Sequence, residues 1–182
     1  MTPPPPVSSC FLDLQEIQQP TTQVQRTFSA TALGTHDEEQ YRLAAPATLD
    51  AILKKDDTKY HLLGRIDATL QLQCARCLEP YPTDVSVELD LLYVAATENR
   101  GEPESQVEES DLSTAYFRDD RIDLGQLVRE QFQLSLPMKP LCRDECRGLC
   151  VVCGGNRNVT VCECDETWED PRFAGLKHLL KQ

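Results

Sequence analysis

The chain has 182 residues, a length that allows one domain with a short appendage. Its formal net charge of -12, from 18 Lys and Arg against 30 Asp and Glu, argues against a surface built mainly to neutralise nucleic-acid phosphates. No stretch reaches the apolar length that a membrane span needs, so we expect a soluble protein without a membrane partner.

Residues 1–10 are rich in proline and predict an irregular arm. This beginning has neither the basic and apolar regions of a secretory signal nor the Arg-rich character of a transit peptide. We therefore expect a cytoplasmic protein. In a reducing compartment, its nine cysteines serve more readily as thiolate ligands for a metal than as disulfides.

Short strands are expected over residues 11–17, 24–33 and 41–53. Apolar side chains alternate loosely in the second segment. The third contains Pro46, which lacks an N–H group and so confines the segment to a sheet edge or a bulge.

A long antiparallel hairpin gives the clearest secondary-structure signal. Apolar side chains occupy the even positions of residues 60–74 and the odd positions of residues 85–93. This alternation is typical of two half-buried strands. Their connection contains Cys74 and Cys77, in a Cys-x2-Cys motif followed by Leu-Glu-Pro.

Residues 97–111 carry six acidic side chains against one basic side chain and predict a flexible, solvated loop. An acidic lure for a basic partner is the alternative interpretation. A helix is expected next, over residues 123–136. Asp123 stands three residues before Gln126 in a capping-box-like arrangement, and apolar residues then recur at helical spacing as far as Pro137.

Asp170 and Pro171 predict the start of a second, short amphipathic helix near the end of the chain. Together these elements predict an α+β fold. Its sheet domain, over residues 11–136, is an antiparallel β-sheet, a meander or a partly closed barrel, with packed helices. Residues 137–182 are expected to form a C-terminal zinc-knuckle module that ends in the second helix.

Eight of the cysteines form the strongest chemical signal. They are Cys74, Cys77, Cys142, Cys146, Cys150, Cys153, Cys162 and Cys164. Structural zinc takes four ligands in a tetrahedron, and a Cys-x2-Cys turn supplies two of them from one tight loop. Glycines after Cys153 suit the backbone of such a turn. Two such motifs with Cys-x3-Cys and Cys-x-Cys spacings predict one or two structural Zn²⁺ ions.

The pairing of these cysteines into sites is a separate question. We favour Cys74, Cys77, Cys142 and Cys146 for one zinc ion, which would clamp the hairpin end to the later chain. The remaining four cysteines would hold the second ion. Interleaved sites, as in cross-brace modules, and a single zinc ion with spare cysteines stay open as alternatives.

Other uses of the thiols are weighed against zinc. A thioredoxin-like redox pair requires a dithiol at a helix N-terminus, whereas Cys74 and Cys77 join two expected strands. Cys10 has no neighbouring cysteine and is interpreted as a small buried apolar residue. A thiol redox or metal-handling protein remains the alternative function.

No catalytic constellation is evident. The three histidines are scattered away from the cysteines, and they are interpreted as surface or strand residues. They are His36, His61 and His178. No Ser-His-Asp order, metalloprotease motif, P-loop or dinucleotide turn occurs. Because all-cysteine zinc sites are normally closed, a zinc hydrolase is also disfavoured, and we expect neither an enzyme nor a small-molecule substrate.

Several of these motifs, taken in order, carry a family resemblance. The hairpin with Cys-x2-Cys-Leu-Glu-Pro is followed by Leu-Pro-Met-Lys-Pro-Leu-Cys at residues 136–142. Cys-Arg-Gly-Leu-Cys-x2-Cys-Gly follows at residues 146–154, and Asp-Pro-Arg-Phe-Ala-Gly-Leu at residues 170–176. In this combination the chain resembles the YceD family of large ribosomal RNA subunit accumulation proteins, roughly over residues 11–180.

The resemblance implies participation in ribosome biogenesis, in the accumulation of large-subunit ribosomal RNA, without a known catalytic reaction. The implied partners are a ribosomal precursor particle, rRNA or a basic ribosomal protein. Four arginines within the cysteine loops are candidate phosphate or partner contacts, and they could equally balance the thiolate charge. They are Arg76, Arg143, Arg147 and Arg157.

Overall fold

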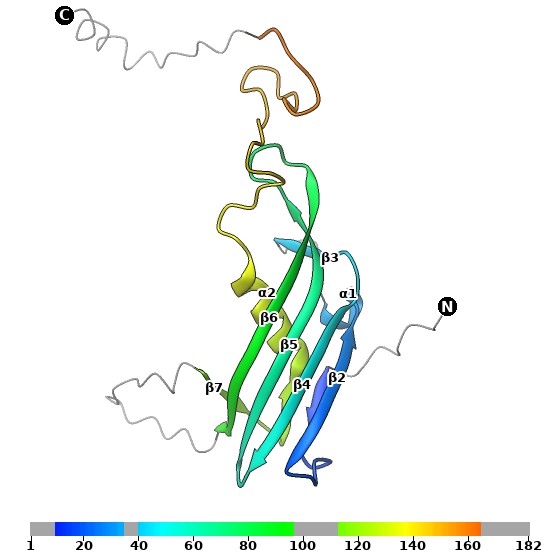
Figure 1. Ribbon diagram of the computed structural model, residues 1–182, viewed down its shortest axis with the longest axis vertical. Coiled ribbons are helices and arrows are strands. Elements are labelled where there is room, and N and C mark those ends of the chain that lie inside the picture. Colours follow the sequence, from blue (N-terminus) through cyan, green and yellow to red (C-terminus); the bar gives the residue numbers. More distant parts are fainter. Residues whose placement is uncertain (1–9, 35–39, 97–112, 165–182) are drawn as a thin grey trace, which may run out of the picture.

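The computed structural model describes residues 10–34, 40–96 and 113–164 (Figure 1). The expected acidic loop and C-terminal helix, and all but the last residue of the Pro-rich arm, lie outside the described residues.

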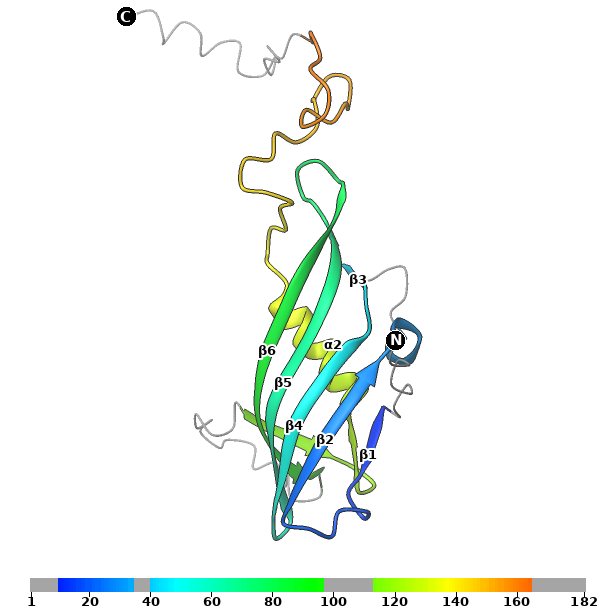
Figure 2. The ribbon, with the colours of Figure 1, turned by 45° about the vertical axis from the view of Figure 1, so that its right-hand side comes forward.

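Within the described ranges, six strands form one sheet in the order β2-β4-β5-β6-β7, with β3 paired to β5, and β1 pairs with β8 in a small second sheet. The strands are β1 (Phe11–Asp13), β2 (Thr21–Phe28), β3 (Tyr41–Leu43), β4 (Ala47–Asp56), β5 (Lys59–Gln73), β6 (Pro80–Ala95), β7 (Thr114–Phe117) and β8 (Arg121–Asp123). The helices are α1 (Ala30–Leu33) and α2 (Leu124–Ser135). The sheet is strongly curled, and α2 lies across one of its faces (Figure 2).

The predicted hairpin is present as β5 and β6, which pair antiparallel from Tyr60 opposite Tyr93 to Gln73 opposite Pro80. Side chains at the even positions of β5 face the core, and Leu62, Ile66 and Leu70 are fully buried. The alternation along β5 therefore predicted the buried face correctly.

Two expected strands are corrected by the structure. The segment 24–33 is not one strand, because β2 ends at Phe28 and Ser29 then caps α1, its hydroxyl oxygen accepting from the N–H of Ala32 at 3.2 Å. The segment 41–53 is divided into β3 and β4 around Pro46. Proline has no N–H group to continue the ladder, so the chain leaves the sheet there and re-enters it.

The expectation of a purely antiparallel sheet is also corrected. β7 pairs with β6 in parallel, with Leu92 opposite Thr114. Parallel neighbours need a long connection, and here the chain between them passes through residues 96–113. The first expected strand is shorter than predicted, since β1 ends at Asp13.

The helix predicted over residues 123–136 is confirmed as α2. Its N-cap is Asp123, whose carboxylate accepts from the N–H of Gln126 at 2.8 Å. The apolar stripe of α2 is buried against the sheet, and Phe132 meets the ring of Tyr41 edge to face at 5.8 Å between centroids. Among the described residues, no helix is both long and apolar enough to cross a membrane.

The hairpin of β5 and β6 extends beyond the part of the sheet that α2 covers (Figure 2). At its tip, it meets the chain that follows α2. Because this strand pair is long, residues 74–79 at its tip lie at the same end of the molecule as the cysteines that follow α2.

Candidate metal centres

The hairpin tip holds the first two thiols in a tight loop. The N–H of Cys74 donates to the carbonyl oxygen of Glu79, and the N–H of Leu78 donates to the carbonyl oxygen of Cys74, each at 3.0 Å. Leu78 adopts a left-handed conformation with φ of 61°, which closes the loop. Such a conformation costs a non-glycine residue about 1–2 kcal/mol, so other interactions must hold the loop in this shape.

Several hydrogen bonds join this tip to the chain after α2. The N–H of Ala75 donates to the carbonyl oxygen of Pro140 at 2.8 Å, and the N–H of Leu149 donates to the carbonyl oxygen of Arg76 at 3.1 Å. The guanidinium of Arg76 donates to the carbonyl oxygen of Cys146 at 2.9 Å. The C-terminal segment is thereby placed beside Cys74 and Cys77.

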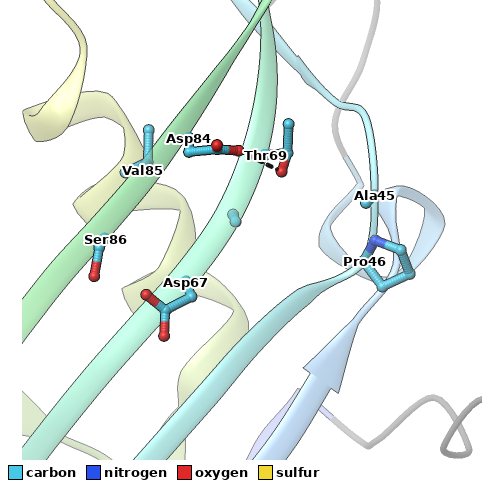
Figure 3. Close-up of a pocket in the computed structure, with 8 residues that line it drawn as sticks. Ala45, Pro46, Asp67, Thr69, Asp84, Val85 and Ser86 are labelled. Atoms are coloured by element: carbon cyan, nitrogen blue, oxygen red, sulfur yellow. Dashed lines mark hydrogen bonds between the residues drawn. The ribbon is translucent and has the colours of Figure 1, made fainter.

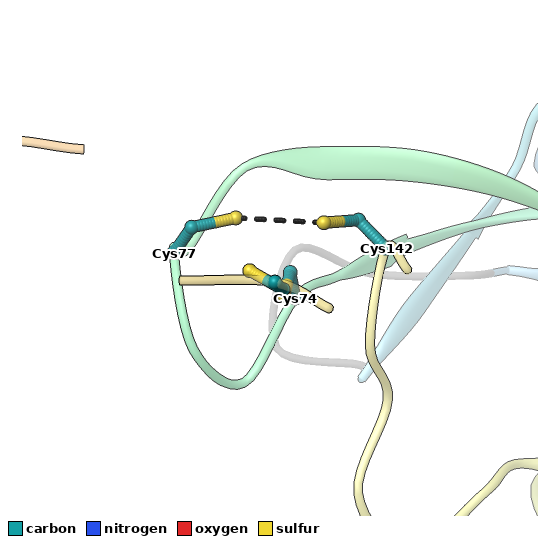
Figure 4. Close-up of side chains that lie close together, drawn as sticks. Cys74, Cys77 and Cys142 are labelled. Atoms are coloured by element: carbon teal, nitrogen blue, oxygen red, sulfur yellow. Dashed lines mark hydrogen bonds between the residues drawn. The ribbon is translucent and has the colours of Figure 1, made fainter. Parts of the chain in front are cut away.

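Four sulfurs meet at this junction and form the proximal cysteine group: Cys74, Cys77, Cys142 and Cys146. All four lie within 4.8 Å of one another, and the sulfurs of Cys74 and Cys146 are 3.8 Å apart. Those of Cys77 and Cys142 are 3.7 Å apart and face each other beside Cys74 (Figure 4). Four thiolates bound to one zinc at about 2.3 Å lie about 3.8 Å apart, because they occupy the corners of a tetrahedron. The geometry of this group therefore fits a tetrahedral ion.

The distal cysteine group consists of Cys150, Cys153, Cys162 and Cys164, whose sulfurs also lie within 4.8 Å of one another. Cys150 begins a knuckle in which its N–H donates to the carbonyl oxygen of Gly155 at 2.8 Å. The N–H of Val152 points at the Cys150 sulfur, at 3.4 Å. Backbone N–H groups aimed at a sulfur stabilise the thiolate that a metal requires.

The two groups differ in exposure. In the proximal group Cys74, Cys77 and Cys146 are buried, while in the distal group Cys150 is buried and Cys153 is exposed. A metal in the proximal group would be enclosed by protein. A metal in the distal group would be accessible to solvent from the side of Cys153.

In each group, the pKa of one thiol is lowered and the pKa of another is raised. Burial raises the pKa of Cys74, but hydrogen bonds from the backbone of Cys142, Cys77 and Arg76 outweigh it and lower the value to about 6. Burial, followed by the neighbouring thiols, raises the pKa of Cys142 to about 12.

In the distal group, backbone hydrogen bonds from Cys153 and Val152 lower the pKa of Cys150 to about 6. The hydrogen bond with the Cys153 thiol raises that of Cys164 to about 12. Adjacent thiolates repel one another, so a central divalent cation is what would allow all four sulfurs of a group to ionise together.

Asn158 is a supporting residue that the sequence reasoning missed. Its side-chain amide donates to the Cys146 sulfur at 3.3 Å, and its carbonyl oxygen accepts from the N–H of Arg147 at 2.9 Å. The sequence offers one weak signal for this role. Asn158 follows a Gly-Gly turn and Asn156, and asparagine side chains in turns often bond to nearby backbone groups. Its sulfur contact depends on tertiary structure.

The eight predicted ligands are thus brought together in the two sets of four that we favoured. Metal binding itself stays a prediction. Cys74 and Cys77 lie between two strands and not at a helix N-terminus, so the geometry of a thioredoxin-like pair is lacking. Cys10 packs against the sheet core and lies outside both groups, as expected, but it is half-buried and not fully buried.

His61 lies on β5, where its ring contacts the carboxylate of Asp90 at 2.6 Å. Its interpretation as a strand residue is confirmed. His36 and His178 lie outside the described residues.

A separate hollow of about 320 Å³ lies where β3 and β4 part at Pro46 (Figure 3). Asp67, Thr69 and Asp84 line it, and the Thr69 hydroxyl donates to Asp84 at 2.8 Å. Its lining residues include no histidine, cysteine, lysine or arginine. Among the described residues, this hollow is therefore lined by carboxylates, hydroxyls and small apolar side chains, and it lies apart from both cysteine groups.

A family model described as large ribosomal RNA subunit accumulation protein YceD matches residues 62–180. An uncharacterized protein of Mycobacterium tuberculosis is 32% identical over 145 residues, which are 74% of this chain and 63% of that protein. A maize protein named large ribosomal RNA subunit accumulation protein YCED homolog 1, chloroplastic, is 24% identical over 84% of this chain and 60% of its own length.

An uncharacterized Bacillus subtilis protein is 31% identical over 64% of each chain. The chain thus spans less than two thirds of the length of these curated relatives. No solved structure matches it.

Proposed function

This chain belongs to the YceD family, and from that membership we propose that it is a non-enzymatic zinc-binding factor for the accumulation of large-subunit ribosomal RNA. The name of its maize relative refers to the same role. The proposed partners are a ribosomal precursor particle, rRNA or a basic ribosomal protein, and the proposed place of action is the cytoplasm.

The observation that carries the zinc part of the proposal is the packing of the proximal cysteine group. Its sulfurs come from the hairpin tip and from a segment about 70 positions later, yet two pairs of them stand at 3.7 and 3.8 Å. Thiolate ligands in a tetrahedron select zinc or iron, and zinc has no redox chemistry of its own. Zinc at this point would tie the sheet to the C-terminal segment.

A closed set of four thiolates leaves no coordination position for a substrate or an activated water. For this reason we propose a structural and not a catalytic metal. In this scheme residues 11–136 are the sheet domain and residues 137–182 the zinc-binding module, which would present a surface to the partner.

Two measurements test this function. Metal analysis of the purified chain should find close to two zinc ions per molecule. A deletion strain should accumulate less mature large-subunit rRNA, and the tagged protein should sediment with large-subunit precursors. Unchanged precursor and mature rRNA levels after deletion would contradict the role in accumulation.

The deletion strain also links the metal to the function. Complementation with Cys74→Ser should fail, because it removes a ligand from the proximal group. Cys10→Ser is the matched control, since Cys10 lies outside both groups and serine can keep its contact with the carbonyl oxygen of Ala32. Full complementation by both variants would show that the proximal metal is dispensable.

A thiol redox or metal-handling function is the second candidate, and the exposure of Cys153 favours it. An exposed thiolate is accessible to oxidants and to competing chelators. Rapid, reversible oxidation of the purified chain without bound zinc would support this candidate. Two tightly held zinc ions and slowly reacting thiols would exclude it.

A further inference from the structure

The six-stranded sheet has its longer edge strand at β2, on the opposite side of the sheet from β7 (Figure 1). β2 spans eight residues and β7 spans four. One edge of β2 pairs with β4, and among the described residues no strand pairs with its other edge. An edge of this kind presents backbone N–H and C=O groups that can pair with a strand from another chain.

The hydrogen-bond alternation along β2 identifies the backbone groups that point away from β4. The carbonyl oxygen of Pro20 accepts from the N–H of Lys55 at 2.9 Å, in the register that also places Thr21 opposite Lys54. Bonded residues alternate along an antiparallel ladder, so the even positions of β2 bond to β4 and the odd positions point outward. The outward-facing residues are Thr21, Gln23, Gln25 and Thr27.

β2 lacks most of the features that protect an edge strand from pairing. Such strands are usually short, carry Lys or Pro, or are interrupted by a bulge. β2 contains no Lys, Pro, Asp or Glu, and its eight residues pair with β4 consecutively, from Thr21 opposite Lys54 to Phe28 opposite Ala47. The side chains of Thr21, Gln23 and Gln25 are exposed. This edge is therefore long, regular and accessible.

The sequence of β2 is compatible with antiparallel pairing to itself. With Val24 opposite the partner subunit's Val24, Gln23 lies opposite the partner subunit's Gln25, and Thr21 opposite the partner subunit's Thr27. This register uses all four outward-facing residues, and each such pair exchanges two backbone hydrogen bonds. No other register of the same parity uses all four.

Arg26 is the one charged residue of β2, and it does not oppose this pairing. In the register above it lies opposite the partner subunit's Thr22, so no like charges face each other. Its guanidinium donates to the outward carbonyl oxygen of Gln25 at 3.0 Å. A carbonyl oxygen has two lone pairs, so this oxygen can also accept from a partner strand.

The charges around β2 favour a second copy at this edge over other parts of the surface. The chain has a net charge of -12, so two copies repel each other where acidic residues gather. On the exposed sheet face, β6 carries Asp84, Glu88 and Asp90. Beside β2, by contrast, β4 carries one acid and one base on that face, Asp50 and Lys54.

Distance further weakens the repulsion between the two β4 strands. In a paired dimer they would be three strand spacings apart, which is about 14 Å. This separation exceeds the screening length of about 8 Å at physiological ionic strength. The β2 edge is thus a place where two copies of an acidic chain can meet.

We propose that β2 is an interface between two copies of this chain, whose β2 strands pair antiparallel and join the two six-stranded sheets into one. Because the paired strands run in opposite directions, the two hairpin tips and their cysteine groups lie at opposite ends of the dimer. The interface involves neither the cysteine groups nor the proposed ribosomal partner, so its test is independent of the proposed function.

Sedimentation velocity of the zinc-loaded full chain, with a phosphine reductant to prevent disulfides, measures the dimer from low-micromolar to near-millimolar concentration. A single strand pair is a small interface, so we expect a weak, reversible dimer. Gln25→Pro removes an outward N–H from each copy but no bond to β4, and it should raise the dissociation constant by about tenfold or more.

Gln25→Ala is the matched control. It removes the same side chain but keeps the outward N–H, so it should change the dissociation constant far less than the proline does. Equal dissociation constants for a folded proline variant and the alanine variant would place the interface elsewhere and overturn the proposal.

Gln25→Lys provides a test that does not depend on the folding of the proline variant. It places two lysines at diagonal positions across the interface, about 7–8 Å apart, where their repulsion should weaken the dimer. Added salt screens this repulsion and should restore the dimer. Unchanged dimerisation of the lysine variant at low salt would overturn the proposal, as would an unaltered chain that stays monomeric at every concentration.

Amide hydrogen exchange followed by NMR on the unaltered chain examines the edge directly. The N–H groups of Gln23, Gln25 and Thr27 should become protected as the concentration rises. Those of Thr22 and Val24, which bond to β4, should be protected throughout. Protection of the odd positions in a monomer would show that the edge is covered within one chain, and protection only in large-subunit precursors would assign it to a precursor protein. Either result would exclude the second copy.

Discussion

The sheet domain and the cysteine module, which we define as the described residues 137–164, are stabilised in different ways. The sheet domain has a continuous apolar core in which Phe28, Leu53 and Phe132 are fully buried. In the module, by contrast, Val151, Val159 and Val161 are 79, 81 and 93% exposed. Its buried cluster consists of the proximal cysteines and a few residues packed on them.

The module also lacks regular structure over its described length, apart from the isolated bridge between Leu149 and Asn156. A segment this small, with its apolar side chains in solvent, cannot gain enough from apolar burial to offset the entropy of folding. Small domains of this kind depend on cross-links such as a metal ion. From this contrast we expect that apolar burial suffices to fold the sheet domain, whereas the module requires its thiol groups.

Removal of the metal should give the largest difference in stability between the module and the sheet domain. Structural zinc contributes an apparent 10–16 kcal/mol in small zinc-binding peptides, about the whole stability of a domain. After chelation, we expect the backbone amides of the module to exchange rapidly with solvent while those of β5 retain their protection. Hydrogen exchange read by mass spectrometry measures both regions at once. Unchanged protection of the module without metal would show that the contrast is wrong.

Gly64→Ala in β5 tests the opposite case, in which the sheet domain is destabilised and the cysteine groups are left unchanged. A Cβ atom at Gly64 would lie 2.3 Å from the carbonyl oxygen of Asp50 and 2.5 Å from the Cα of Ala51, so the neighbouring strand would have to move. We expect a loss of about 3 kcal/mol in the free energy of unfolding, with the zinc content of the folded protein unchanged. Urea unfolding followed by circular dichroism gives the first quantity and metal analysis the second.

Gly155→Ala is the control for that substitution. Its added Cβ would meet the Cys153 sulfur at 3.4 Å and the Thr160 hydroxyl at 3.5 Å, which are ordinary contacts. The unfolding midpoint should stay close to that of the unaltered chain. Equal destabilisation by the two alanines would remove the evidence for a close strand approach at Gly64.

Single cysteine substitutions distinguish the proximal cysteine group from the distal cysteine group. Cys74→Ser and Cys153→Ser should each reduce the zinc content from two ions to one. Only Cys74→Ser should release the module from the hairpin tip, because Cys153 belongs to the distal cysteine group. Limited proteolysis after α2 detects the release. If Cys74→Ser kept two zinc ions and full stability, the pairing of Cys74 with Cys146 would be wrong.

Among the changes expected to weaken metal binding, Asn158→Ala should have the smallest effect. It removes the amide that donates to the Cys146 sulfur without removing a ligand. Losing such a supporting contact typically lowers metal affinity by about 10- to 100-fold. Competition with a chromogenic chelator measures this change at the proximal group. Asn158→Asp keeps a side-chain oxygen for Arg147 but loses the donor, so similar affinity in both variants would assign the effect to the sulfur contact.

The sequence alone determined the elements whose signals are local. Alternation with a period of two predicted β5 and β6 and their buried face, and the side chain of Asp123 predicted the start of α2. These signals are readable because each depends on neighbours within a few positions. The motif order also led to the family, and the spacing of the cysteines led to the eight candidate ligands.

Tertiary structure alone decided the contacts between distant segments. β7 pairs with β6 in parallel, and Cys74 meets Cys146, which lies 72 positions later. No periodic pattern in the sequence indicates either contact. The sulfur contact of Asn158 and the different surroundings of Arg76 and Arg147 are of the same kind. Identical residue types acquire different roles there, because a side chain's partners depend on which backbone segments the fold brings beside it.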